Sequence, residues 1–91
     1  MKAAAENVKP VILELGGKSP HIIFADADMD VAVPEIAKGI YTNCGQICSV
    51  GSRLLVEVSI KDRLLKKLRE YCRQMRIGPP LKNPDMGPLV S

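Results

Sequence analysis

The chain has 91 residues and a net charge of +3, and 46% of its residues are apolar but only 3% aromatic. This composition excludes a disordered polar chain and a surface built on base stacking, so we expect no nucleic-acid partner. The sequence has no apolar run of about 18 residues and no signal-peptide pattern, and its three cysteines cannot all pair. We therefore expect no membrane contact and a cytoplasmic location.

The first 24 residues predict one short helix and two strands. Residues 1–8 are rich in helix formers and indicate the end of a helix. The apolar run Val11–Leu15 stops at a glycine pair and predicts a strand that is buried on both faces. His21–Phe24 follows a Ser-Pro turn and predicts a second strand.

A helix and a third strand are expected next. Asp28 or Asp30 can cap the helix, whose apolar positions run to Tyr41. We expect Pro34 to fall in the first turn, where its missing N–H leaves no hydrogen bond unmade. Leu54–Val58 predicts the third strand. This order of helices and strands indicates an α/β layered fold.

The segment 59–77 predicts a basic amphipathic helix. Its apolar residues recur at helical spacing, Ser59 is positioned to cap it, and Gly78 with two prolines behind it ends it. Residues 61–76 carry a net charge of +5, and the rest of the chain carries −2. Such a helix either covers a core with a solvated outer face or binds an acidic partner. We favour the core helix, because the apolar face has neither Trp nor Phe.

The sequence departs from the common metal and phosphate motifs. The aspartates of 26–30 resemble the start of a calcium loop, but the glycine and the final glutamate of that loop are missing. Cys44 and Cys48 have no second pair of ligands, and His21 is the only histidine, so no zinc site is expected. Residues 16–19 end like a phosphate loop but lack its first glycine. We therefore expect no metal.

Two residues stand out as candidates for catalysis. Cys48 lies between Gly45 and Gly51, where the backbone can turn sharply and present its amides to a ligand, so its thiol could act as a nucleophile. Glu14 ends an apolar strand, and clefts lie at the carboxyl ends of strands in open α/β sheets. A partly buried glutamate there has a raised pKa and can act as a general base. A buried free thiol and an edge carboxylate explain the two residues equally well, and a Cys48–His21 pair is a further alternative.

At these residues the sequence resembles the aldehyde dehydrogenase superfamily. Leu13–Pro20 is similar to the glutamate motif of that family, and Asn43–Arg53 is similar to its cysteine motif. The separation of 34 residues between Glu14 and Cys48 also matches the family, as does Asp85–Ser91. The resemblance therefore covers essentially the whole chain.

The resemblance implies a function and a fold. Cys48 would attack an aldehyde to give a thiohemiacetal, hydride would pass to NAD or NADP, and Glu14 would activate the water that hydrolyses the thioester. Leu15 and Gly16 would contact the cofactor. The fold would be part of a three-layer α/β architecture, with residues 1–15 at the edge of the cofactor-binding part and 16–91 beginning the catalytic part.

The resemblance also implies that the chain is a fragment of a larger enzyme. The family's oxyanion asparagine and its pyrophosphate-binding segment have no counterpart in these residues. We therefore expect the isolated chain to be inactive. It would associate with the rest of a larger enzyme or form a homo-oligomer. The alternatives are a non-catalytic remnant and a small binding module that uses the basic helix 59–77.

Overall fold

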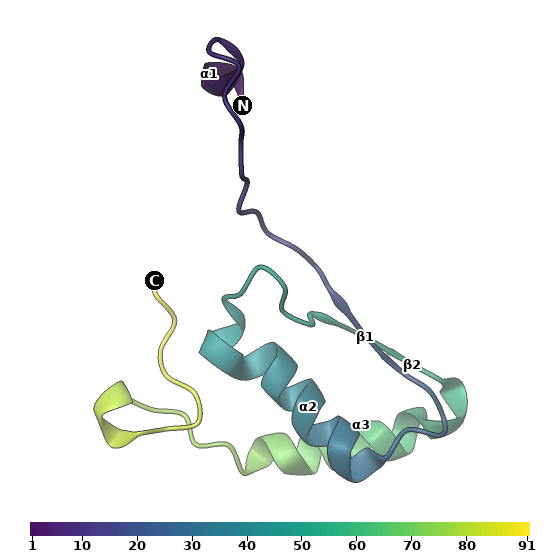
Figure 1. Ribbon diagram of the computed structural model, residues 1–91. Coiled ribbons are helices and arrows are strands. Elements are labelled where there is room, and N and C mark those ends of the chain that lie inside the picture. The colour runs from purple at the N-terminus through teal and green to yellow at the C-terminus, as the bar shows by residue number, and fades with distance from the viewer.

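The computed structural model describes all 91 residues and contains three helices and two strands (Figure 1). In Figure 1 the two long helices lie beside the pair of strands, and the N-terminal segment leads away from them. The elements are α1 (Lys2–Ala5), β1 (Pro20–Ile23), α2 (Met29–Tyr41), β2 (Arg53–Val56) and α3 (Lys61–Arg73), with short 3₁₀ turns at Thr42–Gly45, Val58–Ile60 and Pro80–Lys82. No helix is both long and apolar enough to cross a bilayer.

The centre of the fold is one strand–helix–strand unit. β1 and β2 pair in parallel, with Pro20 opposite Arg53 and Ile23 opposite Val56, and α2 connects them. The predicted strands His21–Phe24 and Leu54–Val58 are thereby confirmed with shifted ends. A small core forms where α2 and the start of α3 pack on the inner face of the strands. It consists of Met29, Val33, Ile36, Ile60 and Leu64, with Ile23, Leu54 and Val56 against it.

The predicted strand Val11–Leu15 is wrong. This segment is extended, but it belongs to no sheet, and most of its apolar side chains are exposed. None of the backbone groups of residues 11–17 forms a backbone hydrogen bond within the chain. A strand buried on both faces requires neighbouring strands and covering helices, and these 91 residues do not supply them.

Helix α2 begins as predicted but accommodates its proline differently. Asp28 is the N-cap, and its Oδ1 accepts a hydrogen bond of 2.9 Å from the Asp30 N–H. Pro34 is the sixth residue of α2, so the prediction that it lies in the first turn is wrong. In a regular helix the N–H at this position would donate to the carbonyl of Asp30, and that hydrogen bond is missing.

Helix α3 is shorter than the predicted segment 59–77. It spans Lys61–Arg73, and Ser59 does not cap it, because the Ser59 hydroxyl donates to the Glu57 carboxylate instead. Leu64 is fully buried in the core, which confirms a core-facing helix. On the outer side, Lys67 donates to Asp30 over 2.6 Å and joins α3 to the start of α2. This ion pair lowers the pKa of Asp30.

The molecule is far less compact than an independent domain of its length. Its radius of gyration is 17.8 Å, whereas a compact chain of this length has about 12 Å. Its accessible surface is 7347 Å², compared with about 5,200 Å² for a compact protein of 9.9 kDa. Only seven residues are buried. The outer face of the strands leaves Ile22, Phe24 and Leu55 exposed, so the apolar content of the chain exceeds what its own core can cover.

Candidate active site

Cys48 lies in a tight turn between α2 and β2. The Val50 N–H donates to the Ile47 carbonyl over 3.1 Å, which closes a β-turn with Cys48 in its second position. The Val50 side chain is buried, and the Gly51 N–H donates to the Gly39 carbonyl at the end of α2. The Cys48 side chain itself is exposed. The turn therefore holds the thiol at the surface on an anchored backbone.

The loop before this turn has an unusual backbone. Asn43, Cys44 and Gly45 all lie in the left-handed region, with φ of 51°, 60° and 74°. Each residue other than glycine costs about 1–2 kcal/mol in this conformation, less for asparagine. Side chains brace the loop: Asn43 Nδ2 donates to the Gln46 carbonyl, and Gln46 Nε2 donates to the Asn43 carbonyl, each over 3.1 Å. The loop reverses the chain between α2 and Cys48.

The segment containing Glu14 approaches the same turn through Gly17. A Cβ placed on Gly17 would lie 2.6 Å from the Cys48 carbonyl oxygen, so the two backbones are in contact and only glycine fits. Three residues of extended chain span at most about 10 Å, which limits the separation of Glu14 from this contact. The structure thus brings the two motifs together, although 30 residues of chain lie between Gly17 and Cys48.

Arg53 joins the two segments a second time. Its Nε donates to the Lys18 carbonyl over 2.8 Å, and its N–H donates to the Ser19 carbonyl at 3.3 Å. These contacts continue directly into the β1–β2 ladder. Both motifs therefore lie at the amino ends of the strands, and the prediction of a cleft at carboxyl ends is wrong. That prediction assumed a strand ending at Leu15, which does not form.

Glu14 is exposed. The prediction that it is partly buried is therefore wrong for this chain, for the same reason that Val11–Leu15 is not a strand: no neighbouring element covers the segment. Glu14 makes no hydrogen bond or ion pair, so its carboxylate is open to solvent. The two catalytic candidates are both accessible from solvent.

Leu15 and Gly16, the expected cofactor contacts, lie in open surroundings beside this contact. A Cβ on Gly16 would meet no atom within 4 Å, and the backbone groups of Leu15 form no backbone hydrogen bond. Free amide donors and acceptors beside open space fit a planar carboxamide such as that of nicotinamide. The backbone present is compatible with such a group, and its open surroundings do not select one ligand over another.

His21 serves a packing role in β1. Its imidazole lies in the gap between Gly39 and Gly51, where a Cβ on either glycine would approach ring atoms to 2.5 Å or less. It forms no hydrogen bond with Cys48. The Cys48–His21 pair is thus not supported, and the histidine instead joins β1 to the end of α2 and to the backbone that follows the Cys48 turn.

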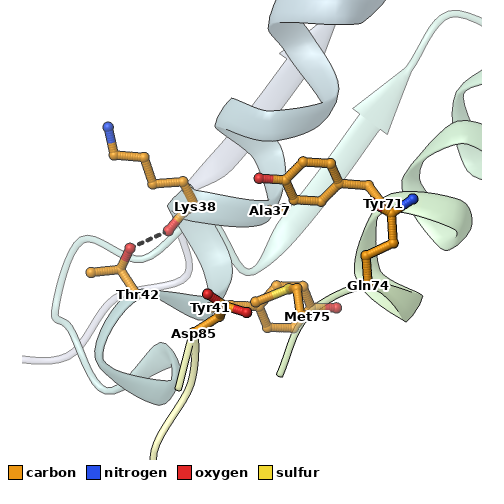
Figure 2. Close-up of a pocket in the computed structure, with 8 residues that line it drawn as sticks. All are labelled: Ala37, Lys38, Tyr41, Thr42, Tyr71, Gln74, Met75 and Asp85. Atoms are coloured by element: carbon orange, nitrogen blue, oxygen red, sulfur yellow. Dashed lines mark hydrogen bonds between the residues drawn. The ribbon is translucent and has the colours of Figure 1, made fainter. Parts of the chain in front are cut away.

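A separate cavity of about 370 Å³ lies between the ends of α2 and α3 (Figure 2). Neither Cys48 nor Glu14 lines it. At its edge the Thr42 hydroxyl donates to the Lys38 carbonyl over 2.6 Å, the hydrogen bond drawn as a dashed line in Figure 2. The Cys72 thiol, as a hydrogen-bond partner, raises the pKa of Tyr41, and partial burial acts in the same direction. The lining residues are Ala37, Lys38, Tyr41, Thr42, Tyr71, Gln74, Met75 and Asp85.

Comparison with known proteins identifies the family. The sequence profile of the aldehyde dehydrogenase family matches residues 1–91. The betaine aldehyde dehydrogenase of Bacillus subtilis is 45% identical to the whole of this chain. An NAD-dependent aldehyde dehydrogenase of Sinorhizobium meliloti has a crystal structure that superposes with a TM-score of 0.94 at 48% identity over 99% of the chain. The chain belongs to the aldehyde dehydrogenase family.

The match is complete for this chain but partial for its relatives. The chain spans 19% of the Bacillus subtilis enzyme and 18% of the Sinorhizobium meliloti structure. A betaine aldehyde dehydrogenase of Staphylococcus aureus, whose structure contains NAD⁺, superposes with a TM-score of 0.90 at 45% identity, and 18% of that chain is covered. The predicted family and α/β architecture are confirmed, and these 91 residues adopt the same fold as in much longer enzymes.

Two features of the site have only a weak signal in the sequence. Gly17 is one of a glycine pair, and nothing local distinguishes the glycine that touches Cys48 from Gly16, which faces open space. The second feature is a contact between residues 87–90 and the loop before Cys48. Both are long-range contacts, which no local spacing encodes.

Proposed function

We propose that this chain supplies the nucleophile and the general base of an aldehyde oxidation, with Cys48 and Glu14 in these roles. The observation that carries the proposal is the backbone contact of Gly17 with Cys48, which joins the two motif segments at one exposed surface. Family membership adds the substrate class, because the relatives are named as aldehyde dehydrogenases.

The chemistry follows from the position of each group. The Cys48 thiolate adds to the aldehyde carbonyl and forms a thiohemiacetal. The Cys48 N–H forms no backbone hydrogen bond in the chain, so it is free to donate to the oxyanion that develops. Glu14 then takes a proton from a water molecule, which attacks the thioester and releases the carboxylic acid. Before this hydrolysis, the thiohemiacetal loses a hydride and thereby becomes the thioester.

The cofactor would contact the chain at Leu15 and Gly16. A bound NAD or NADP supplies the hydride acceptor. The Leu15 backbone groups would hold its carboxamide, and the open space at Gly16 would accept the ring. NAD is the favoured cofactor, because the Staphylococcus aureus relative contains it.

We infer that the isolated 91-residue chain does not turn over. Its core buries seven residues, and the backbone of residues 11–17 has no partner strand, so the geometry of Glu14 relative to Cys48 is not held rigidly. We also propose that the chain works in association with the rest of a larger enzyme, as part of a homo-oligomer or otherwise, and in the cytoplasm.

A hybrid enzyme tests the proposal. Residues 1–91 replace the matching segment of the Bacillus subtilis betaine aldehyde dehydrogenase, and NADH formation is measured with an aldehyde that the parent oxidises. We expect turnover in the hybrid, none in its Cys48→Ala variant and none with the isolated chain. A hybrid that folds, binds NAD and still shows no turnover above Cys48→Ala would refute the catalytic role.

The role of Glu14 has its own kinetic signature. In the hybrid, Glu14→Gln should leave a first burst of NADH, because thiohemiacetal formation needs only the thiolate, and should slow steady-state turnover by about 10²–10⁴-fold. Unchanged steady-state turnover in Glu14→Gln would show that Glu14 is not the general base. Glutamine is chosen because it matches glutamate in size but cannot accept the proton.

The alternative is a binding module that uses the basic face of α3. The charge of that face favours it, but Lys67 is already paired with Asp30, and Leu64 is used in the core. Salt-dependent binding of duplex DNA by the isolated chain, lost on substitution of Lys66 and Lys67, would favour this alternative over the catalytic one.

A further inference from the structure

Residues 87–90, which we term the strap, lie against the loop that precedes Cys48. The Cys44 thiol lies 3.3 Å from the Gly87 carbonyl oxygen and 3.4 Å from that of Pro88, and it donates to both. The Val90 N–H donates to Oε1 of Gln46 over 3.1 Å. The strap is thus bonded to two residues of the loop, although more than 40 residues separate them in sequence.

The loop that the strap contacts is the left-handed one. Cys44 occupies the centre of the three consecutive residues with positive φ, and it is the residue type least suited to that conformation among them. Its thiol forms the only two side-chain hydrogen bonds that the loop makes to the Gly87–Pro88 backbone. The strap therefore contacts the loop where its backbone is most strained.

Gln46 links the strap to the rest of the loop. Its Nε2 donates to the Asn43 carbonyl, while its Oε1 accepts from Val90, so both ends of one amide are used. The next residue, Ile47, begins the β-turn that contains Cys48. A shift of Gln46 is therefore passed directly to the turn that carries the thiol.

The strap is itself anchored at its start. Asp85 accepts three hydrogen bonds from Arg76, from its N–H, Nε and Nη2 at 2.8, 3.2 and 3.1 Å. Nη2 also donates to the Asn83 carbonyl, and Gly78 donates its N–H to the Met86 carbonyl. Paired bonds of this kind from one guanidinium fix direction as well as distance. The chain leaves this clamp immediately before Gly87.

We propose that the strap is a positioning element for the nucleophile, acting on Cys48 through Cys44 and Gln46. It forms no hydrogen bond with Cys48 or with the expected cofactor contacts, so it sets the direction of the Cys48 turn and takes no part in the chemistry. The inference rests on the proposed role of Cys48, and it adds the residues that hold this cysteine in place.

Two proline variants of the hybrid enzyme provide the test. Val90→Pro removes the N–H that bonds to Gln46, and Leu89→Pro, the matched control, removes an N–H that forms no hydrogen bond. Loss of one such bond predicts about a five-fold lower kcat for Val90→Pro. The KM for the aldehyde and all constants of Leu89→Pro should stay within about two-fold. Equal kcat values for the two variants, or a change in KM alone, would overturn the proposal.

Three substitutions of Cys44 distinguish the effect of the strap contact on kcat from the effect of backbone strain. Cys44→Ala should lower kcat, and Cys44→Ser should restore it, because a hydroxyl can donate to the same two carbonyls. Cys44→Gly relieves the left-handed backbone but loses the donor, and we expect it to stay slow. Full activity of Cys44→Gly, or no rescue by Cys44→Ser, would show that the strap contact does not matter.

Amide hydrogen exchange keeps this test independent of the proposed function. In the hybrid, Val90→Pro should speed exchange across residues 43–50 relative to Leu89→Pro, whether or not the enzyme turns over. If all hybrids are inactive but exchange differs in this way, the proposed function fails and the strap stands. If exchange is equal in the two variants, the proposal that the strap positions the Cys48 turn is refuted.

Discussion

The contact of Gly17 with Cys48 makes a quantitative prediction for Gly17→Ala. The added Cβ would lie 2.6 Å from the Cys48 carbonyl oxygen, and an ordinary contact needs at least 3.4 Å. The obstructing atom belongs to the backbone, so no side chain can move aside, and the two segments must separate by about 0.8 Å. A displacement on the order of 1 Å at a reacting centre costs about 10²-fold in rate. That factor equals about 2.7 kcal/mol of transition-state stabilisation.

The measurement is kcat/KM in the hybrid enzyme. Gly78→Ala is the matched control, since its Cβ would meet no atom within 4 Å and it carries the same loss of backbone freedom. We expect Gly17→Ala to fall about 100-fold and Gly78→Ala to stay within about three-fold, with equal far-ultraviolet circular dichroism. If Gly17→Ala is as active as Gly78→Ala, the two motifs do not depend on this contact, and the observation behind the proposed function is lost.

Three further predictions concern other contacts. Gly51→Ala should lower the thermal midpoint of the hybrid, because the added Cβ would overlap the His21 ring. Adding His21→Ala to Gly51→Ala should recover part of this loss, and additive effects of the two substitutions would contradict the prediction. Hydrogen bonds from Arg76 lower the pKa of Asp85 below its ordinary value of 3.8, so the Arg76–Asp85 pair stabilises the fold above pH 3.8 and ceases to do so as the pH falls through the lowered pKa of the folded state. In Arg76→Gln, NMR titration of the carboxyl group should find a higher Asp85 pKa than in the parent, and an unchanged pKa would rule out the ion pair. Gly16→Ala should raise the KM for NAD with little change in protein stability, and an unaltered KM would place the nicotinamide elsewhere.

Local pattern was sufficient for the elements that carry their own signals. The caps and periodicity of α2, and the apolar runs of β1 and β2, predicted these elements to within a few residues. Val11–Leu15 carries an equally strong strand signal and does not form a strand, because no other segment of these 91 residues pairs with it. At α3, Ser59 is a suitable cap by residue type, but the nearby carboxylate of Glu57 takes its hydroxyl first.

In the candidate site, too, local features could be predicted from the sequence and long-range contacts could not. The turn at Cys48 was predicted from its flanking glycines, and the structure has it. Glu14 and Cys48 were each singled out by residue type and position, and the resemblance supplied their joint role, since no local rule relates residues this far apart. The contact at Gly17 and the bonds of Cys44 depend on backbone geometry across the fold, and residue type alone did not indicate them.

The unpaired backbone of residues 11–17 also bears on how the isolated chain behaves at high concentration. An extended apolar segment with free donors and acceptors, beside a two-stranded sheet whose outer edges are open, is a template on which further copies can add as strands. Each addition would bury Ile12 and Leu15, which the single molecule leaves in water. Produced alone, the chain is therefore prone to self-association into β-rich aggregates.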